Sequence, residues 1–386
     1  MGVPPPPAPA AVWLNRGMRT RLEVGLPTAV NEPAPATRSS VTIIGVDPHK
    51  SVHEACALTD GKPAQQRTPA SRTGYLKLLR WGRGFPDRTW AVEGAHGLGR
   101  HLAQFLVANG ERVVDVPSFL SARVRELSRG GRRKTDAIDA LAAARAARDA
   151  DHLHPVQAED IGTVIAMLSE RRDSLIGQRT RTANQLHALL AELTPGGLAG
   201  ELTALTAARL LRGVRPDTLV AEQRKRLAGD LLRDIRDLDR KLTDIDRRLD
   251  LALLEHGSTL TDIGGVGTIL AARVLAHTGR IDRFPNEDHF ASYAGAAPVE
   301  VASGEHSRHR LSRAGNRQLN CAVHLIALQQ IRHNREGGGD YYRRKLAQGK
   351  TAREALRCLK RRITSKLYRR MLADHSRRHT RTPTVT

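Results

Sequence analysis

The sequence predicts an α/β domain with a mixed sheet, followed by domains that are mainly helical. Two observations carry this prediction. Apolar runs of strand length begin at residue 41, and strand-like and helix-like runs then alternate to about residue 150. From about 158 to 256 the spacing of apolar residues becomes almost wholly helical. Meandering strands followed by alternating helices and strands form a mixed sheet that helices cover.

The first domain, residues 40–150, is predicted to open with an antiparallel meander. Residues 41–46 form a buried strand, 52–58 a second strand, and the turn at 59–62 leads into a third. The alternating part that follows is predicted to contain a helix at 73–81, a strand at 89–92, a helix at 98–109, a strand at 112–116 and helices from Ser118 and Thr135. This order of elements is that of ribonuclease-H-like folds. Residues 1–39 are rich in Pro and Ala without periodicity, so we expect a disordered extension.

The rest of the chain divides into a helical region at 151–256, a Gly-containing domain at 257–340 and a basic helical tail at 341–386. In the helical region, residues 222–254 carry apolar side chains at three- and four-residue spacing among many Arg and Asp. This stripe suits a coiled coil between subunits, and it equally suits a solvated helix packed on its own chain. Pro195, Gly196 and Gly197 predict a break in the helices.

The charge of the chain predicts a polyanionic partner. There are 62 Lys and Arg against 40 Asp and Glu, which gives a net charge of +22 and an isoelectric point near 11.0. Such an excess suits an enzyme that acts on nucleic acid, and it also suits a ribosomal or chromatin-type packing protein without chemistry. No apolar run approaches the roughly 20 residues of a membrane span, so we expect a cytoplasmic, nucleoid-associated protein.

Four acids are the candidate catalytic residues. Asp47 and Glu93 each end a predicted strand, and the carboxyl ends of strands are where ligands gather in open sheets. Asp136 and Asp139 are three residues apart on a predicted helix and therefore share one of its faces. Four converging carboxylates need a cation to offset their repulsion, and oxygen ligands favour Mg²⁺ or Mn²⁺. Each acid alone could instead be an ordinary turn, cap or solvated residue.

Asp47 also suits a different chemistry, that of enzymes that bind ATP. The Gly-Val-Asp strand end at 45–47 also occurs in sugar kinases and actin-like ATPases. Those enzymes need a glycine-rich turn after the acid to approach ATP phosphates, whereas Pro48, His49 and Lys50 follow here. A phosphodiester substrate clamped by two metal ions is the favoured interpretation.

Two features of the third domain suggest contact with DNA. The segment 260–272 looks like a helix-hairpin-helix in which Gly265 and Gly267 let backbone N–H groups approach a phosphate. Further along, a basic loop concentrates Arg308, Arg310, Arg313 and Arg317, which can neutralise several phosphates. The alternative is a solvated basic loop without a ligand.

Taken together, these motifs resemble those of the DEDD transposases of bacterial insertion sequences, over about residues 42–334. The residues that carry the resemblance are 45–50, 92–93, 134–140, 264–267, Ser303 with Gly304, and 312–316. The resemblance implies a RuvC-like domain, a metal-binding tetrad of Asp47, Glu93, Asp136 and Asp139, and a transposase domain in which Ser303 is the nucleophile. It also implies a homo-oligomer, dimeric or tetrameric, that acts on element-end and target DNA under the guidance of a noncoding bridge RNA.

Two rival functions remain open at this stage. A metal-dependent resolvase or nuclease would use water as the nucleophile and leave Ser303 a structural role. A decayed element would leave a protein that binds nucleic acid without cutting it. The intact set of four acids argues against decay, and a trapped protein–DNA adduct would distinguish the serine mechanism from the water mechanism.

Overall fold

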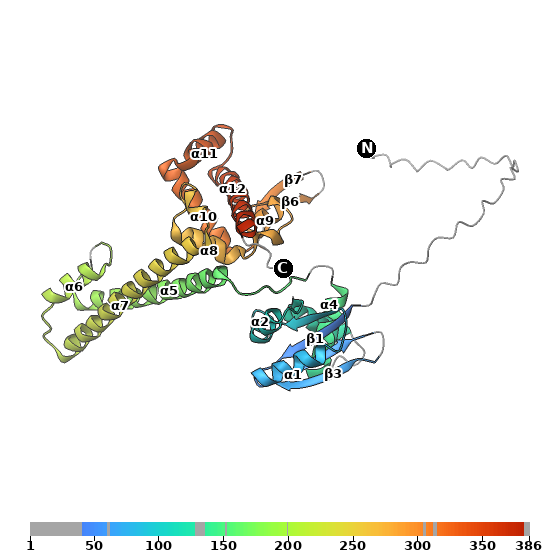
Figure 1. Ribbon diagram of the computed structural model, residues 1–386. Helices are drawn as coiled ribbons and strands as arrows, with labels where there is room; N and C mark the ends of the chain where they lie inside the picture. Colours follow the sequence, from blue (N-terminus) through green and yellow to red (C-terminus); the bar gives the residue numbers. More distant parts are fainter. Residues whose placement is uncertain are drawn as a thin grey trace, which may run out of the picture.

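The computed structural model contains a sheet domain, a long helical hairpin and a helical C-terminal domain (Figure 1). It describes residues 41–59, 62–127, 136–150, 153–198, 200–303, 306–311 and 315–381. For Asp136 and for residues 298–303 and 306–311 the description covers the backbone alone. The extension predicted at 1–39 lies outside the described residues. No helix in the described ranges is long and apolar enough to cross a membrane.

The sheet domain contains the elements that the sequence predicts. Its strands are β1 (Thr42–Pro48), β2 (Val52–Leu58), β3 (Ala64–Pro69), β4 (Arg88–Glu93) and β5 (Val113–Val116), and its helices are α1 (Arg72–Gly82), α2 (Arg100–Ala108), α3 (Ser118–Leu127) and α4 (Asp136–Asp149). The strands form a five-stranded sheet in the order β3-β2-β1-β4-β5. The first three strands pair antiparallel, while β1, β4 and β5 run parallel. This mixed sheet is compatible with a ribonuclease-H-like domain.

Alternation along the strands gives the sheet two different faces. Ile44, Val46, Trp90 and Val92 belong to one face and pack with apolar residues of α1 and α2. Ala91 and Val116 belong to the other face, where Ala146 of α4 and partly buried residues of α3 cover them. The acids discussed below lie on this second face.

Gly45 allows α4 to lie directly on β1. A Cβ atom at this position would come within 2.1 Å of the Ala140 carbonyl oxygen and 2.4 Å of the Ala144 nitrogen. Both are backbone atoms, so no side-chain rotation could relieve the contact. The short side chains of α4 and the missing side chain of Gly45 therefore set the distance between helix and sheet.

We expect Gly45→Ala to destabilise the sheet domain by about 1–3 kcal/mol, the usual cost of overpacking a tight core. The measurement is urea unfolding followed by circular dichroism. Gly229→Ala is the matched control, because Gly229 lies inside a helix with no atom within 4 Å of its Cβ position. The control should be stabilised by up to about 1 kcal/mol, since Ala favours helix over Gly. Equal stability of Gly45→Ala and the wild type would contradict the close packing.

The middle region is a hairpin of two long helices within one chain. Helix α5 (Ile161–Leu193) ends just before the predicted Pro195–Gly197 break, the short α6 (Ala204–Gly213) follows, and α7 (Leu219–His256) returns along α5. Buried α7 residues recur at three and four positions, and Arg172–Asp246 and Arg179–Asp239 pairs, both 2.5 Å, join the two helices. The apolar stripe at 222–254 thus packs on its own chain.

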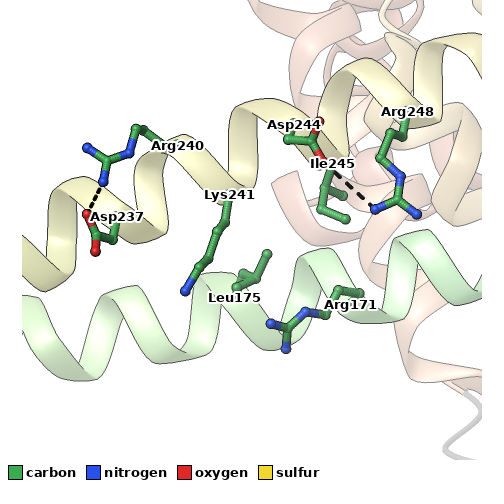
Figure 2. Close-up of a pocket in the computed structure, with 8 residues that line it drawn as sticks. All are labelled: Arg171, Leu175, Asp237, Arg240, Lys241, Asp244, Ile245 and Arg248. Atoms are coloured by element: carbon green, nitrogen blue, oxygen red, sulfur yellow. Dashed lines mark hydrogen bonds and ion pairs between the residues drawn. The ribbon is translucent and has the colours of Figure 1, made fainter.

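One side of this hairpin is a shallow groove with charged walls (Figure 2). Arg171 on α5 and Lys241 on α7 border it, and Arg240 is paired with Asp237 three residues away. The tip of the hairpin has a small apolar core of its own, in which α6 packs between the ends of α5 and α7. The hairpin is therefore held at both ends, by this tip core and by the C-terminal domain.

The C-terminal domain is built around the base of the hairpin. It contains η1 (Leu260–Asp262), α8 (Thr268–Thr278), η2 (Ile281–Arg283), α9 (Glu287–Tyr293), β6 (Pro298–Ser303), β7 (His306–Leu311), α10 (Arg317–His333), η3 (Arg335–Gly337), α11 (Gly338–Ala347) and α12 (Ala352–Arg381). Residues 341–381, predicted to be part of a basic helical tail at 341–386, are not peripheral. Leu359, Ile363, Leu367 and Met371 of α12 instead lie in the same apolar core as α5, α7, α8 and α10.

Where α7 meets α12, a histidine is buried without charge. His256 is 6 % exposed, and Arg378 Nη1 lies 2.7 Å from its Nε2. Burial, and secondarily the charge of Arg378, lower the pKa of His256 from 6.5 to about 4. The unfolded chain therefore takes up this proton at a higher pH than the folded chain, and stability falls as pH drops from 6.5 toward 4.

We expect His256→Gln to reduce this acid sensitivity, because a Gln oxygen can accept the Arg378 hydrogen bond without titrating. Between pH 7.5 and 5.0 the wild type should lose about 2 kcal/mol more stability than the variant. Urea unfolding at the two pH values measures the difference. An identical loss in both proteins would show that His256 titrates normally.

Candidate active site

Asp47 and Glu93 lie at one edge of the sheet, on the same face. In the parallel register of β1 and β4, Val46 pairs with Val92, so the next residue of each strand is one of the two acids. Asp47 is two residues beyond Gly45, and Glu93 two beyond Ala91, which places both on the face covered by α3 and α4. Asp47 is 8 % exposed, and Glu93 is half-buried. The prediction that both acids end strands is confirmed.

The third acid reaches this face from a helix. Asp139 is 5 % exposed and immediately precedes Ala140, the residue that contacts Gly45. Asp136 is the first residue of α4, three positions earlier, and its side chain lies outside the described part of the structure. Helix α4 thus brings Asp139 onto this face of the sheet.

Helix α3 supplies partners for two of these carboxylates. Ser121 Oγ donates a hydrogen bond to Glu93 Oε2 at 2.6 Å, and Arg125 Nη1 donates to Asp139 Oδ1 at 2.5 Å. Asp139 raises the pKa of Arg125, and Glu93 also contributes through its charge. The positive charge of Arg125 therefore interacts with the carboxylates of both Asp139 and Glu93. At the first strand, His49 Nε2 is 3.2 Å from Asp47 Oδ2.

Sequence reasoning missed Ser121 and Arg125, although a signal was present. The two residues are four apart on a helix that directly follows β5, so they share a face that returns toward the sheet edge. It also missed Glu54, which pairs with Asp47 across β1 and β2 and is neutralised by Arg67 at 2.9 Å. The position of Glu54 beside Asp47 could not be predicted, because nothing in the sequence fixes the register of β1 against β2.

The acids at this edge have the donor atoms of a metal site. Asp47, Glu93 and Asp139 offer the oxygen donors that Mg²⁺ and Mn²⁺ prefer, from one face of one edge. Among the described residues, however, no three His, Cys, Asp or Glu side chains come close enough together to hold a metal. The described acids bind His49, Ser121 and Arg125 instead. The donor chemistry fits a metal ion, whereas each of the described acids has a partner within the protein, of which Arg125 carries a positive charge.

Ser303 lies in another domain. It is the last residue of β6 and pairs with His306, the first residue of β7, at the tip of a two-stranded hairpin. Arg308 and Arg310 alternate along β7 and so share a face of the hairpin. The prediction of a basic loop here was wrong for residues 306–311, because the alternating Val299 and Val301 opposite them favour a strand ladder. Arg313 lies outside the described residues, and Arg317 begins α10.

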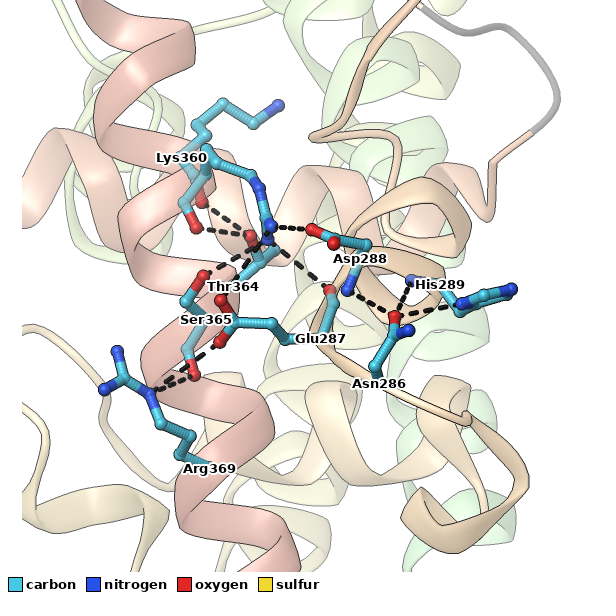
Figure 3. Close-up of polar contacts among 9 residues, drawn as sticks. Asn286, Glu287, Asp288, His289, Lys360, Thr364, Ser365 and Arg369 are labelled. Atoms are coloured by element: carbon cyan, nitrogen blue, oxygen red, sulfur yellow. Dashed lines mark hydrogen bonds and ion pairs between the residues drawn. The ribbon is translucent and has the colours of Figure 1, made fainter.

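The base of this hairpin is fixed by a polar network. Asn320 Nδ2 donates to the Ala294 and Gly295 carbonyls, both at 2.9 Å, and the buried Lys360 of α12 donates to Asn320 Oδ1 at 2.7 Å. Nearby, the start of α9 faces α12 (Figure 3), where Asn286 caps α9 and Arg369 lies 3.9 Å from Glu287. Helix α12 therefore positions both the β6–β7 hairpin and α9.

The glycine turn before α8 is partly occupied by internal contacts. The Gly264 N–H donates to Glu336 Oε1 at 3.1 Å, and Gln330 Nε2 donates to the Gly264 carbonyl at 2.8 Å. Gly265 has a φ of +89° and packs against α10, whereas Gly267 is exposed at the N-cap of α8. A phosphate contact by this turn therefore stays a prediction for Gly265 and Gly267.

Comparison with known proteins identifies the family. A family model described as "Transposase" (DEDD_Tnp_IS110) matches residues 44–195, which include the sheet domain apart from the first two residues of β1, and all of α5. A second, "Transposase IS116/IS110/IS902 family", matches residues 257–343. The chain belongs to the IS110 family of transposases. Helix α12 of the transposase, which supports the β6–β7 hairpin, lies beyond both matched regions.

Relatives of this transposase match it over most of their length. The insertion element IS116 protein of Streptomyces clavuligerus is 27 % identical over 91 % of this chain and 99 % of its own. The insertion element IS110 protein of Streptomyces coelicolor is 31 % identical over 71 % and 79 %. The transposase for insertion sequence element IS1328 of Yersinia enterocolitica is 27 % identical over 72 % and 81 %. The matches support a DNA-processing enzyme that acts for an insertion element.

Proposed function

We propose that the protein cuts and rejoins DNA, with a metal-binding tetrad of Asp47, Glu93, Asp136 and Asp139 and with Ser303 as the nucleophile. The observation that carries the proposal is the convergence of Asp47, Glu93 and Asp139 on one face of one sheet edge. Asp139 has Arg125 as a partner, but three carboxylates kept on one face of one sheet edge also offer the oxygen donors that a divalent cation binds, which favours a role in cation binding.

When bound, Mg²⁺ or Mn²⁺ would supply Lewis-acid stabilisation of the charge that develops on a phosphodiester. The chain's own residues would orient the donors: Ser121 holds one oxygen of Glu93, and the Gly45 contact holds Asp139 against β1. This domain would have the RuvC-like, ribonuclease-H-like form that the strand order suggests.

The hairpin would present Ser303 to DNA. Arg308 and Arg310 lie on the neighbouring strand and would offset the charge of a phosphate bound at Ser303. Arg313, Arg317, Gly265 and Gly267 would add phosphate contacts around it. Because Ser303 and the acids belong to separate domains, their joint action requires those domains, from one protomer or from two, to meet on the DNA.

Choice of the DNA sequence would rest on the bridge RNA that the family resemblance implies, and action as a dimer or tetramer belongs to the same proposal. The basic composition of the chain supports an RNA partner only in general terms.

The test of the proposed function is strand cleavage of element-end DNA, with the cognate RNA, in Mg²⁺ and in excess chelator. We expect cleavage in Mg²⁺, its loss in chelator and its return when Mn²⁺ is added. Full activity in chelator would exclude the metal mechanism. The separation of Ser303 from the acids favours one alternative, a water-using nuclease; cleavage in Mg²⁺ without any protein–DNA adduct would support it.

Arg125 gives a further prediction for the same site. A cation that binds Asp139 must displace the Arg125 guanidinium, which holds that carboxylate at 2.5 Å. Charge-assisted hydrogen bonds contribute about 1.5–3 kcal/mol, so Arg125→Ala should bind Mg²⁺ about tenfold more tightly. Calorimetric titration of nucleic-acid-free protein measures this. Arg148→Ala, which removes the exposed partner of Asp149 on the same helix α4, should leave Mg²⁺ affinity unchanged. Equal affinities in all three proteins would remove Arg125 from the site.

A further inference from the structure

Three cations gather around one aromatic ring where α11 packs against α12. The centroid of the Tyr341 ring is 5.2 Å from Arg344 Cζ, 5.6 Å from Lys345 Nζ and 5.1 Å from Arg362 Cζ. Tyr341 is half-buried and packs against the C-terminal core, while Arg344 and Arg362 are exposed. We call these four residues the Tyr341 cluster. The ring faces attract the cations, but the cations repel one another, so the cluster favours an anionic ligand.

The acids that interact with the cluster are already bound elsewhere. Glu336 interacts with Arg362, yet its pKa is lowered first by its hydrogen bond from Lys366 and next by the Gly264 N–H. Asp340 interacts with Arg344, yet its pKa is lowered first by Asn334 and next by Arg343. These carboxylates therefore leave much of the positive charge of the cluster uncompensated.

The surrounding helices add to this charge. Residues 341–381 contain fifteen Lys and Arg but only two acids, Glu354 and Asp374. The apolar residues of α12 are buried in the C-terminal core, and some of its cations, such as Arg361 and Lys366, pair with acids of other elements, whereas Arg362 is exposed. Close to the turn between α11 and α12, Lys350 and Arg353 are also exposed. The cluster thus lies in a part of the chain that has a large excess of basic residues.

We propose that the Tyr341 cluster is a binding site for the phosphate backbone of duplex DNA, separate from the Ser303 hairpin and its arginines. The family acts on DNA, so duplex DNA is the polyanion that this surface meets. Arg344, Lys345 and Arg362 contact phosphate oxygens, and Tyr341 holds the three cations together before DNA arrives. Such contacts carry no sequence information and fix the position of the protein on the duplex. Because α12 also supports the hairpin through Lys360, DNA held here is held close to the base of that hairpin.

The experiment measures the salt dependence of binding to a duplex DNA of arbitrary sequence, with full-length protein freed of nucleic acid. The variant carries Arg344→Gln, Lys345→Gln and Arg362→Gln. The plot of log K against log salt has a negative slope, and each lost phosphate contact reduces its magnitude by about 0.9. We therefore expect the magnitude of the slope to decrease by roughly 2 to 3 in this variant. The conservative variant Arg344→Lys with Arg362→Lys keeps the charges and should keep the wild-type slope.

The matched control changes the same charge at Arg233, Arg240 and Arg247 of α7, each of which is already paired with an Asp three residues away. Its slope should stay within about one unit of the wild type. An equal fall in the cluster variant and the control would overturn the proposal. The proposal would also be overturned if the cluster variant lost affinity for a hairpin RNA of the same length but kept its affinity for duplex DNA, because the site would then bind RNA. Binding needs no cleavage, so the result is independent of the carboxylate and serine proposals.

Discussion

Purified Asp47→Asn protein should lose strand cleavage by about 1,000-fold or more while it still binds DNA. Asn keeps the size of the side chain but removes the negative charge that would hold a metal ion, and metal catalysis depends on that charge. Asp47 is buried beside β2 and paired with Glu54 in the sheet register, so the exchange leaves the backbone contacts in place. Cleavage of labelled element-end DNA under single-turnover conditions measures the effect.

Asp115→Asn is the matched control for this loss. Asp115 lies in β5 at the same edge of the sheet but alternates onto the opposite face, where its carboxylate accepts from the Ala95 N–H at 2.7 Å. Its replacement should cost some stability and leave the cleavage rate of folded protein within about threefold of the wild type. Cleavage at the parental rate by Asp47→Asn would remove the tetrad from the mechanism.

Ser303→Ala should abolish both the covalent protein–DNA adduct and recombination. In the proposed reaction the Ser303 oxygen attacks the phosphorus, its proton passes to a base, and the leaving 3′ or 5′ oxygen takes up a proton as the strand is released. The phosphoserine bond that forms replaces the bond that breaks, so no other reactant is consumed before rejoining. Denaturing gels after incubation with element-end DNA and cognate RNA should show the adduct, and peptide mapping should locate it at Ser303.

Ser307→Ala provides the comparison. Ser307 pairs with Ala302 on the same hairpin, adjacent to the Ser303–His306 pair. Its replacement should preserve the adduct, because Ser307 is one register position away from the Ser303–His306 pair and successive strand residues alternate between the two faces of the hairpin. If Ser303→Ala still forms the adduct and recombines normally, the serine is misassigned. A water-using nuclease would then be the better account of the acids.

Much of the sheet domain could be predicted because its signals are local. Strand length, the turn at 59–62 and the alternation of helices and strands fix the elements, and the parallel pairing of β1 with β4 brings Asp47 and Glu93 to one edge. The partners of the acids were not predictable with the same ease. Ser121 and Arg125 reach the edge only through the packing of α3, and Glu54 only through the strand register.

In the C-terminal domain the sequence signals were misleading for a physical reason. The basic residues of β7 and α12 suggested a loop and a tail, because a high density of Arg usually marks solvated chain. In α12 the apolar residues are spread thinly among the cations, yet they fall on one side and fill the core beneath α9 and α10. Lys360 is one of these cations, yet it is buried and bonded to Asn320.

The burial of α12 also bears on the order in which the protein matures during synthesis. The sheet domain, whose core includes Val156, is complete once Glu159 has been made, so it can fold while the rest of the chain is still being translated, as N-terminal domains generally do. The C-terminal core opens with α5 but lacks Leu359, Ile363 and Leu367 until the last helix leaves the ribosome. A chain stopped early would therefore carry the acids on a finished sheet, while the hairpin with Ser303 would still lack the helix that holds its base.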